Sequence, residues 1–244
     1  MRSSYIAGII AGIYALFMTG CVSAPVTHAP VRDAAFYASY FAKPQFRSVY
    51  ASGGIFYKDS RYDGLPFSFI YLNDGANDRK RLSLTDGIFN APAADILLIG
   101  SNVRASIPFL KTNMSGTLRT VAPVLGGIDT DTLLMLFDFR FVDTTRMTGT
   151  KLAVVNDKAE LTVDYAPWQD VIIFSPSTMR IASLTRRSYG NDVTLTFRDY
   201  RDDASGAYPG TVICAAKIPK TEIRLHFSMF VVNENVNWKA TDFR

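Results

Sequence analysis

Few side chains in this sequence are of the types that catalyse reactions or bind metals. The chain contains two histidines, His28 and His226, and two cysteines, Cys21 and Cys214. His226 stands in a run of alternating apolar residues, and His28 lies in a segment rich in proline and small residues. A zinc site needs three or four His, Cys or carboxylate ligands at short spacings. The sequence therefore predicts no metal site and no cofactor.

The acidic residues that stand closest together are Asp199, Asp202 and Asp203. They precede an Ala-Ser-Gly segment typical of a turn, where aspartate commonly hydrogen-bonds to its own backbone. The sequence contains neither a Gly-x-Ser-x-Gly nucleophile motif nor a glycine-rich phosphate loop. We therefore expect no enzyme, although carboxylates dispersed along the chain leave a hydrolase open as a third hypothesis.

The chemistry that the sequence does indicate is the modification of Cys21. Arg2 is followed by an uncharged apolar run, Tyr5–Met18, and then by Thr19-Gly20-Cys21. A basic start, a short apolar core and small residues define a secretory signal, and the run is too short for a good membrane span. Met18-Thr19-Gly20-Cys21 resembles the lipobox of bacterial lipoproteins, with methionine in place of the usual leucine. The alternative is an ordinary signal peptide with an incidental cysteine.

The lipobox resemblance implies cleavage before Cys21 and acylation of this cysteine by chains such as palmitate, and two or three acyl chains give stable anchoring. We expect residues 1–20 to be the signal peptide, residues 21–31 a lipidated tether, and residues 32–244 a single domain. Cys214 then has no disulfide partner and is expected to be a buried, inert thiol.

The 26 basic residues are scattered among 22 acidic ones. Short clusters such as Arg79-Lys80-Arg81 and Arg186-Arg187 are expected to be solvated strand ends, so no nucleic-acid partner is expected.

Periodicity predicts mostly β-structure. Residues 32–43 suit a helix that Pro44 ends. Alternating apolar residues and turn signals predict strands at 46–58, 66–72, 81–85, 96–99, 103–110, 151–155, 160–165, 170–174, 179–185, 193–200, 211–216 and 223–231. Gly53-Gly54 suggests a bulge, and Asp74-Gly75 a hairpin. Ile223, Leu225, Phe227, Met229 and Val231 are expected to share one face. Residues 117–125 and 130–141 suit two central helices separated by Gly126-Gly127, with Asp129 or Thr130 as the second helix's cap.

The order of these elements resembles that of the LolA and LolB family of lipoprotein-sorting proteins. Three stretches carry the likeness: Phe46–Tyr57, Arg81–Asn90 and Val193–Phe243. The resemblance implies an α+β, mainly β fold: a curved antiparallel half-barrel (open β-barrel) with helices covering its concave face. In that family the concave face binds acyl chains of a lipoprotein or lipid, and the receptor member is itself a lipoprotein of the outer membrane.

This resemblance implies a membrane-anchored lipoprotein in outer-membrane lipoprotein or lipid sorting that faces the periplasm, with a periplasmic carrier protein as a further partner. The inner membrane and the cell surface are the alternative locations. The alternative is a non-catalytic envelope lipoprotein that uses the same fold as a protein-interaction platform, with a tightly packed core. Large apolar residues on strands and helices are the candidates to line an acyl cavity: Phe67, Phe69, Leu82, Leu84, Leu133, Phe137, Ile223, Leu225, Phe227 and Met229. For each of them, an ordinary core position is the competing interpretation.

The receptor's apolar loop corresponds here to Gly87-Ile88-Phe89-Asn90. Two large apolar residues at a turn are costly in water, which favours contact with a membrane or ligand. Alternatively, Ile88 and Phe89 fold back onto the core.

Overall fold

The structure is a computed structural model. It describes residues 31–60, 63–75, 77–108, 111–117, 124–125, 128–129, 132, 135–136, 138–188, 190–203 and 206–232. The compact unit that carries the sheet begins at Arg32. Among the described residues, no helix is both long and apolar enough to cross a bilayer.

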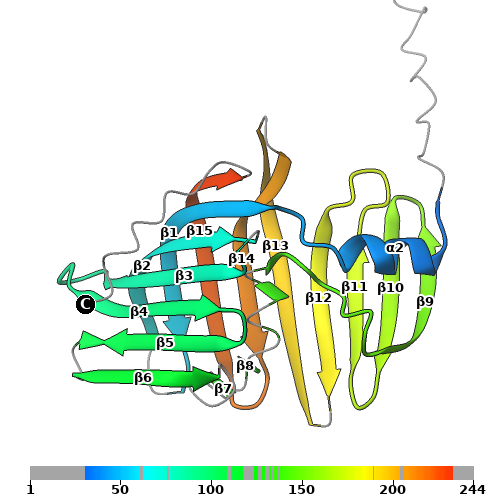
Figure 1. Cartoon of the computed structure of the whole chain (residues 1–244). Coiled ribbons are helices and arrows are strands. Elements are labelled where there is room, and N and C mark those ends of the chain that lie inside the picture. Colours follow the sequence, from blue (N-terminus) through cyan, green and yellow to red (C-terminus); the bar gives the residue numbers. More distant parts are fainter. Residues whose placement is uncertain are drawn as a thin grey trace, which may run out of the picture. The chain divides into compact units, whose positions relative to one another are not determined.

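One antiparallel sheet of thirteen strands dominates this unit (Figure 1). Its strands are β1 (Ser48–Lys58), β2 (Asp63–Asp74), β3 (Arg79–Asp86), β4 (Pro92–Ile99), β5 (Asn102–Ile107), β6 (Thr112–Thr117), β9 (Met147–Val155), β10 (Lys158–Tyr165), β11 (Gln169–Phe174), β12 (Ile181–Ser188), β13 (Asn191–Asp203), β14 (Gly206–Ala216) and β15 (Thr221–Val232). A second, two-stranded sheet pairs β7 (Val124–Leu125) with β8 (Ile128–Asp129).

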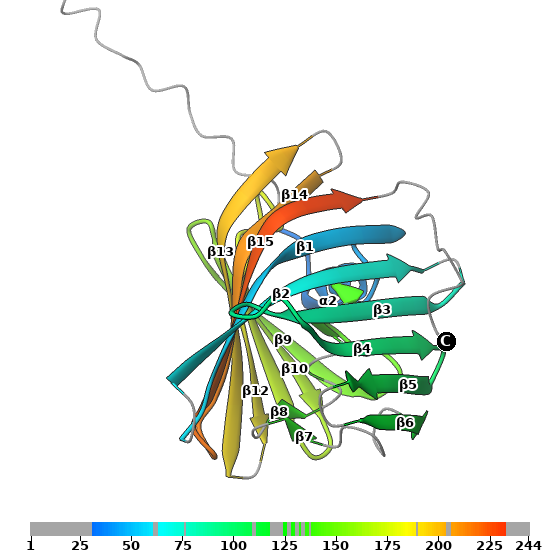
Figure 2. The same cartoon turned by 90° about the vertical axis from the view of Figure 1, so that its left-hand side faces the viewer.

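The sheet consists of two meanders joined through the first and last strands. Its order is β6-β5-β4-β3-β2-β1-β15-β14-β13-β12-β11-β10-β9, so β1 pairs with β15. The strands β2–β6 run at a steep angle to β9–β13, and the sheet is therefore strongly twisted and curved (Figures 1 and 2). The mainly β, open antiparallel fold predicted from the alternating residues is confirmed.

The helix α2 (Ala34–Phe41) packs across one face of the β9–β11 end, which we call the inner face (Figure 1). The carboxylate of its N-cap, Asp33, accepts a 2.7 Å hydrogen bond from the Phe36 amide. Tyr37 and Phe41 are buried and contact the ring of Phe174 on β11, with ring centroids 4.8 and 5.0 Å apart. The helix predicted at residues 32–43 is thus present, shortened at both ends.

A β-bulge in β15 changes which of its residues face inward. Ser52 pairs with Met229 and Gly53 with Phe227, which leaves Ser228 as the extra residue. Ile223, Leu225 and Phe227 are buried before the bulge and Phe230 and Val232 after it, whereas Met229 is 50% exposed. The prediction that Met229 shares the inner face was wrong, because the bulge reverses the alternation. The register shifts at Gly53, where the sequence suggested a bulge or bend, but the extra residue lies on the partner strand β15. A Cβ at Gly53 would lie 1.9 Å from the His226 carbonyl oxygen.

The alternation predicted for residues 193–200 fails at Asp199, although the register between β13 and β14 does not shift there. Asp199 has a φ of 55° and is exposed. The side chains of Phe197 and Tyr200, three residues apart, consequently lie on the same side of β13 and line one pocket. Gly210 on β14 accommodates the irregularity, since a Cβ there would lie 2.7 Å from the Asp199 carbonyl oxygen.

The middle of the chain differs most from the prediction. Residues 112–117 form the edge strand β6, where no strand was expected, and Val124–Leu125 and Ile128–Asp129 are strands where the first central helix and a cap were expected. Thr132, Met135, Leu136 and Asp138 are helical, in agreement with the second predicted helix. We call these four residues the central helical segment; Gly126, Gly127 and Thr130 lie outside the described residues.

Candidate functional site

Aromatic side chains gather on the inner face where β1, β14 and β15 meet. The ring of Phe139 lies 5.4 Å from those of Phe46 and Phe230, and the Phe227 and Phe230 rings are also 5.4 Å apart. The neighbouring rings of Phe141 and Phe197 are 5.4 Å apart as well. All these pairs are edge-to-face, the arrangement that aromatic quadrupoles favour. This part of the inner face is therefore filled by the protein's own side chains.

A pocket of about 300 Å³ opens beside this cluster, and we call it the rim pocket. Its walls come from α2, the residues after α2, the segment before β9, the β11–β12 loop and strands β12–β14. Most of the lining side chains are aromatic or aliphatic: Tyr40, Phe41, Phe46, Phe139, Phe141, Met179, Ile181, Phe197, Tyr200, Ala207 and Pro209, together with Gln45, Thr178, Arg180 and Gly206. Polar and apolar atoms contribute about equally to the exposed surface of the pocket, and its volume is at the small end of the range for ligand sites.

A second pocket of about 320 Å³ adjoins the first and shares five lining residues with it: Thr178, Arg180, Ile181, Phe197 and Tyr200. Its other walls include the β9–β10 turn at Asp157 and the β11–β12 loop. That loop is fixed by Asp157, whose carboxylate accepts hydrogen bonds of 2.7 Å from the hydroxyls of both Ser175 and Ser177. The loop therefore holds Arg180 in a defined place between the two pockets.

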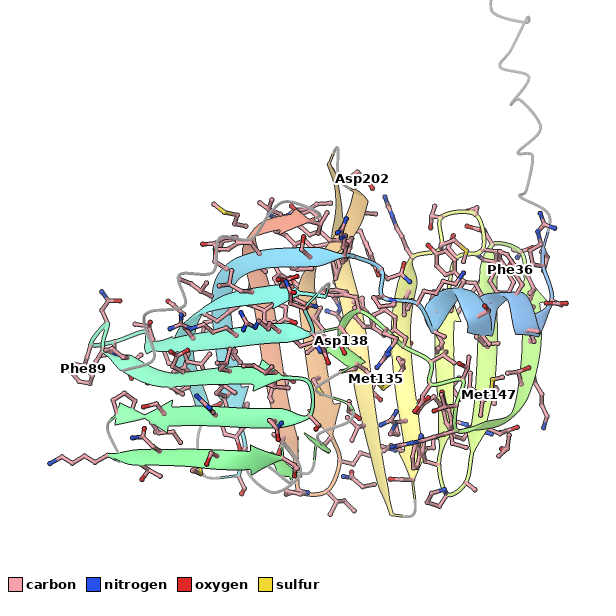
Figure 3. The ribbon with its side chains drawn as sticks, viewed as in Figure 1. Phe36, Phe89, Met135, Asp138, Met147 and Asp202 are labelled. Atoms are coloured by element: carbon pink, nitrogen blue, oxygen red, sulfur yellow. The ribbon has the colours of Figure 1, made fainter. Side chains whose placement is uncertain are left out.

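Arg180 is the one charged residue that lines the rim pocket. Its guanidinium donates to the carboxylate of Asp202, which is 68% exposed on the extension of β13 (Figure 3). The guanidinium also lies over the Tyr200 ring, 5.5 Å from its centroid. Burial raises the pKa of Tyr200 to about 12, while its hydrogen bond to the Ile181 carbonyl and the charge of Arg180 oppose the rise.

A buried ion pair holds the central helical segment against the inner face. Arg186 on β12 donates from Nε and Nη2 to the two carboxylate oxygens of Asp170 on β11, at 2.9 and 3.0 Å. It also donates to Thr132 Oγ1 at 3.2 Å and to the sulfur of Met135 at 2.9 Å, and its guanidinium stacks on Trp168 at 5.2 Å. The Asp170 side chain is fully buried. We call this pair and its contacts the latch.

A second ion pair holds the other end of the segment. Lys80 on β3 lies 3.0 Å from Asp138, and both side chains are largely buried. Burial raises the pKa of the nearby Tyr71 well above its usual value, an effect that the charge of Asp138 increases and the hydrogen bond with Asn73 opposes. Met135 and Asp138 consequently lie in front of the sheet between its two meanders (Figure 3). The expectation that Lys80 and Arg186 are solvated was wrong, because each pairs with a buried carboxylate.

The hairpin between β3 and β4 presents its apolar residues to solvent. Ile88 is 67% and Phe89 81% exposed, and Phe89 projects from the end of the hairpin (Figure 3). The carboxylate of Asp86 accepts hydrogen bonds from the amides of Ile88 and Phe89 at 2.8 and 2.7 Å. The interpretation that these two side chains fold back onto the core was wrong.

The cavity residues proposed from sequence lie mainly on the inner face, away from both pockets. Phe69, Ile223, Leu225 and Phe227 are buried, and Phe67, Leu82 and Leu84 are partly buried. Neither pocket is lined by any of them. Leu133, Phe137 and residues 21–30 of the tether, among them the lipidation candidate Cys21, lie outside the described residues.

The remaining chemical candidates, Cys214 and His226, line neither pocket. Cys214 is buried, as predicted. His226 is exposed, with Nδ1 3.3 Å from the Thr211 hydroxyl. Within the described part of the chain, no three His, Cys, Asp or Glu side chains are grouped so that they could hold a metal ion.

Sequence reasoning missed the rim pocket, Arg180 and the latch. Asp170, the charged residue at the start of the apolar run 170–174, was a usable signal for the latch. A strand seldom carries an unpaired carboxylate on its buried face. The rim pocket gave no such signal, since it brings together residues from 40 to 209 that share no motif.

No family model matches this chain, and no curated protein matches it in sequence. Solved structures do match it in fold, each over 84% of this chain. One is a LolA superfamily protein from Nitrosomonas europaea, with 12% identity and a TM-score of 0.61 over 96% of its own length. Another is a candidate outer membrane lipoprotein-sorting protein domain from Vibrio parahaemolyticus, with 11% identity and a TM-score of 0.60 over 92% of its length. A DUF1329 family protein from Desulfovibrio piger matches with 9% identity and a TM-score of 0.60 over 93% of its length. The chain therefore has the LolA-like fold that the order of its elements predicted.

Proposed function

We propose that this protein is a lipid-anchored component of the bacterial envelope that binds an acyl chain in the rim pocket. The observation that carries the proposal is the pocket itself, about 300 Å³ walled mainly by aromatic and aliphatic side chains beside the inner face. The shared fold with a candidate lipoprotein-sorting domain supports the same class of ligand. The proposed activity is the transfer of a lipid without any change in its covalent bonds.

The size of the rim pocket favours one acyl chain at a time. Burial of a methylene contributes about 0.8 kcal/mol, so a ten-carbon chain gains at most about 8 kcal/mol. Part of this gain is lost in ordering the ligand, and we expect dissociation constants of about 1 µM or weaker. Such a complex releases its ligand readily to a bilayer, as a sorting protein requires.

A lipoprotein with two or three acyl chains needs more room, and the central helical segment is the part of the structure that could provide it. The segment lies over the inner face and is held by the Arg186–Asp170 latch and by the Lys80–Asp138 pair. Its displacement would uncover the apolar residues of β2 and β3, among them Phe69 and Leu84, which the sequence suggested as cavity lining. In this proposal the rim pocket is the entry site and the latch controls the larger space.

The anchor and the hairpin tip would act together at a membrane. Acylated Cys21 would attach the protein, in the outer membrane facing the periplasm, and Ile88 and Phe89 would touch a bilayer or the acyl chain of a cargo. The support for the second contact is the exposure of these side chains on a tip that Asp86 holds in place. A carrier protein in the periplasm is the partner proposed to deliver the cargo.

Displacement of a fluorescent fatty-acid probe by 1-decanol tests acyl binding with a ligand that carries no charge. We expect 1-decanol to bind the wild type and to bind Ala207→Trp at least tenfold more weakly. Ala207 is an exposed residue at the wall of the rim pocket, so the larger side chain would occupy space that the ligand needs. Ala153→Trp, at an exposed position on the edge strand β9, is the matched control and should bind as the wild type does. Equal binding by all three proteins would contradict the assignment of the pocket.

A protein-interaction platform is the second candidate function. The observation that favours it is the filled inner face, where Phe46, Phe139 and Phe230 pack ring against ring. If the wild type takes up neither 1-decanol nor the probe, the platform replaces acyl binding as the preferred function.

A further inference from the structure

We propose that the rim pocket selects acyl chains that end in a carboxylate, so that its preferred ligand is a free fatty acid bound through Arg180. The inference rests on the proposed acyl-binding function and specifies which class of acyl compound the site prefers. It starts from the charge distribution around the pocket: the other fourteen lining residues are uncharged, and Arg180 alone carries a charge.

The guanidinium of Arg180 has hydrogen-bonding capacity left over. One of its terminal nitrogens donates to Asp202, while its Nε is buried and has no hydrogen-bond partner among the described residues. A buried donor without an acceptor costs free energy. Because protein atoms cover Nε, a ligand would meet the exposed part of the guanidinium, whose side chain is 33% exposed, and the gain there would be specific to a ligand that brings an acceptor.

A carboxylate matches this site better than other acyl head groups. The planar guanidinium presents N–H groups in a fork that two carboxylate oxygens can accept together. An alcohol offers a single neutral acceptor, and an ammonium group offers none and is repelled. The surrounding Tyr200, Ile181 and Phe197 side chains keep the local dielectric low, which strengthens the attraction between unlike charges.

Asp202 would compete with the ligand for Arg180. Its carboxylate already pairs with the guanidinium, but it is 68% exposed and lies outside the set of lining residues. Exposed ion pairs are weak because water screens them, so a ligand carboxylate in the pocket can share or replace this contact. Two substitutions with opposite effects follow: loss of Arg180 should weaken the binding of fatty acid, and loss of Asp202 should strengthen it.

The test compares decanoate with 1-decanol at pH 7.5, where a carboxylic acid is ionised, in the probe-displacement assay on the mature chain. We expect the wild type to bind decanoate about tenfold more tightly than 1-decanol. In Arg180→Gln this ratio should fall to about one, and in Asp202→Asn it should rise severalfold. Lys158→Gln, which removes an exposed cation that lines only the second pocket, should leave the ratio unchanged.

The outcomes separate the two proposals. If the wild type binds 1-decanol and decanoate equally, or if Arg180→Gln keeps the tenfold ratio, the carboxylate preference is overturned and acyl binding stands. If neither compound binds, both proposals are overturned. Should Arg180→Gln not fold, Asp202→Asn decides alone, because its side chain is exposed; an unchanged ratio in that variant would overturn the preference.

Discussion

Replacement of Asp170 by asparagine should destabilise the protein far more than any surface change. The substitution keeps the shape of the side chain but leaves the Arg186 guanidinium buried without its charge partner, and arginine cannot lose its proton in compensation. Removal of one partner from a buried ion pair costs about 3 to 5 kcal/mol. With a denaturant dependence of about 3 kcal/mol per molar urea, the unfolding midpoint should fall by about 1 to 1.7 M.

Urea unfolding followed by circular dichroism measures this shift, and two variants serve as controls. Arg187→Met changes the next residue, which is exposed, and should move the midpoint by less than 0.2 M, a shift of about 0.5 kcal/mol. The double variant Asp170→Leu with Arg186→Met removes both charges and should recover most of the loss, since an apolar pair can replace a buried ion pair. A shift below about 0.3 M (~1 kcal/mol) in Asp170→Asn would refute the account of the latch.

Three further predictions concern the bulge in β15, the β3–β4 hairpin tip and Tyr200. Gly53→Val should lower the free energy of unfolding by more than about 2 kcal/mol, because the new Cβ would overlap the β15 backbone. Gly54→Ala should lower it by less than about 1 kcal/mol, because no atom lies nearer than 3.9 Å to the new Cβ. Similar midpoints of the two variants in thermal unfolding would contradict this. Phe89→Ser should weaken sedimentation with liposomes about tenfold without a change in stability. Ile218→Ser, at another exposed apolar residue on the β14–β15 turn, should have no effect, and equal losses would argue against a specific role of the tip. Burial raises the pKa of Tyr200 to about 12, so the folded state keeps this proton to a higher pH than the unfolded state does. The free energy of unfolding should therefore fall as pH rises from 10 to about 12. A Tyr200→Phe variant should lose less stability over that interval, and identical profiles for the two proteins would contradict the assignment.

Most of the sheet could be predicted because the strands are buried on one face and therefore alternate. The strands of the second meander, from β9 to β15, were all anticipated to within a few residues. Two single-residue irregularities, at Ser228 and Asp199, were not: each depends on the partner strand, where Gly53 and Gly210 leave room for it. The edge strand β6 was missed because its residues are polar on both faces and show no apolar period.

The candidate site was less predictable, for a physical reason. The rim pocket forms where segments far apart in the chain meet, and its charged residue, Arg180, lies in a loop fixed by Asp157 from a different hairpin. Sequence patterns report local periodicity and carry no record of such contacts. Lys80 and Arg186 were placed in solvent for the same reason, since their carboxylate partners are 58 and 16 residues away. The hairpin tip was anticipated because its two apolar residues stand at a glycine and asparagine turn.

A crystal structure of residues 22–244 with 10-bromodecan-1-ol would test the central claim most directly, because anomalous scattering locates the bromine. The account predicts one strong bromine peak in the rim pocket, among Phe41, Phe141 and Phe197, and no such peak in Ala207→Trp. A peak between the central helical segment and β2–β3, near Phe69 and Leu84, would contradict it and restore the cavity proposed from sequence. The absence of any peak at saturating ligand would contradict acyl binding altogether.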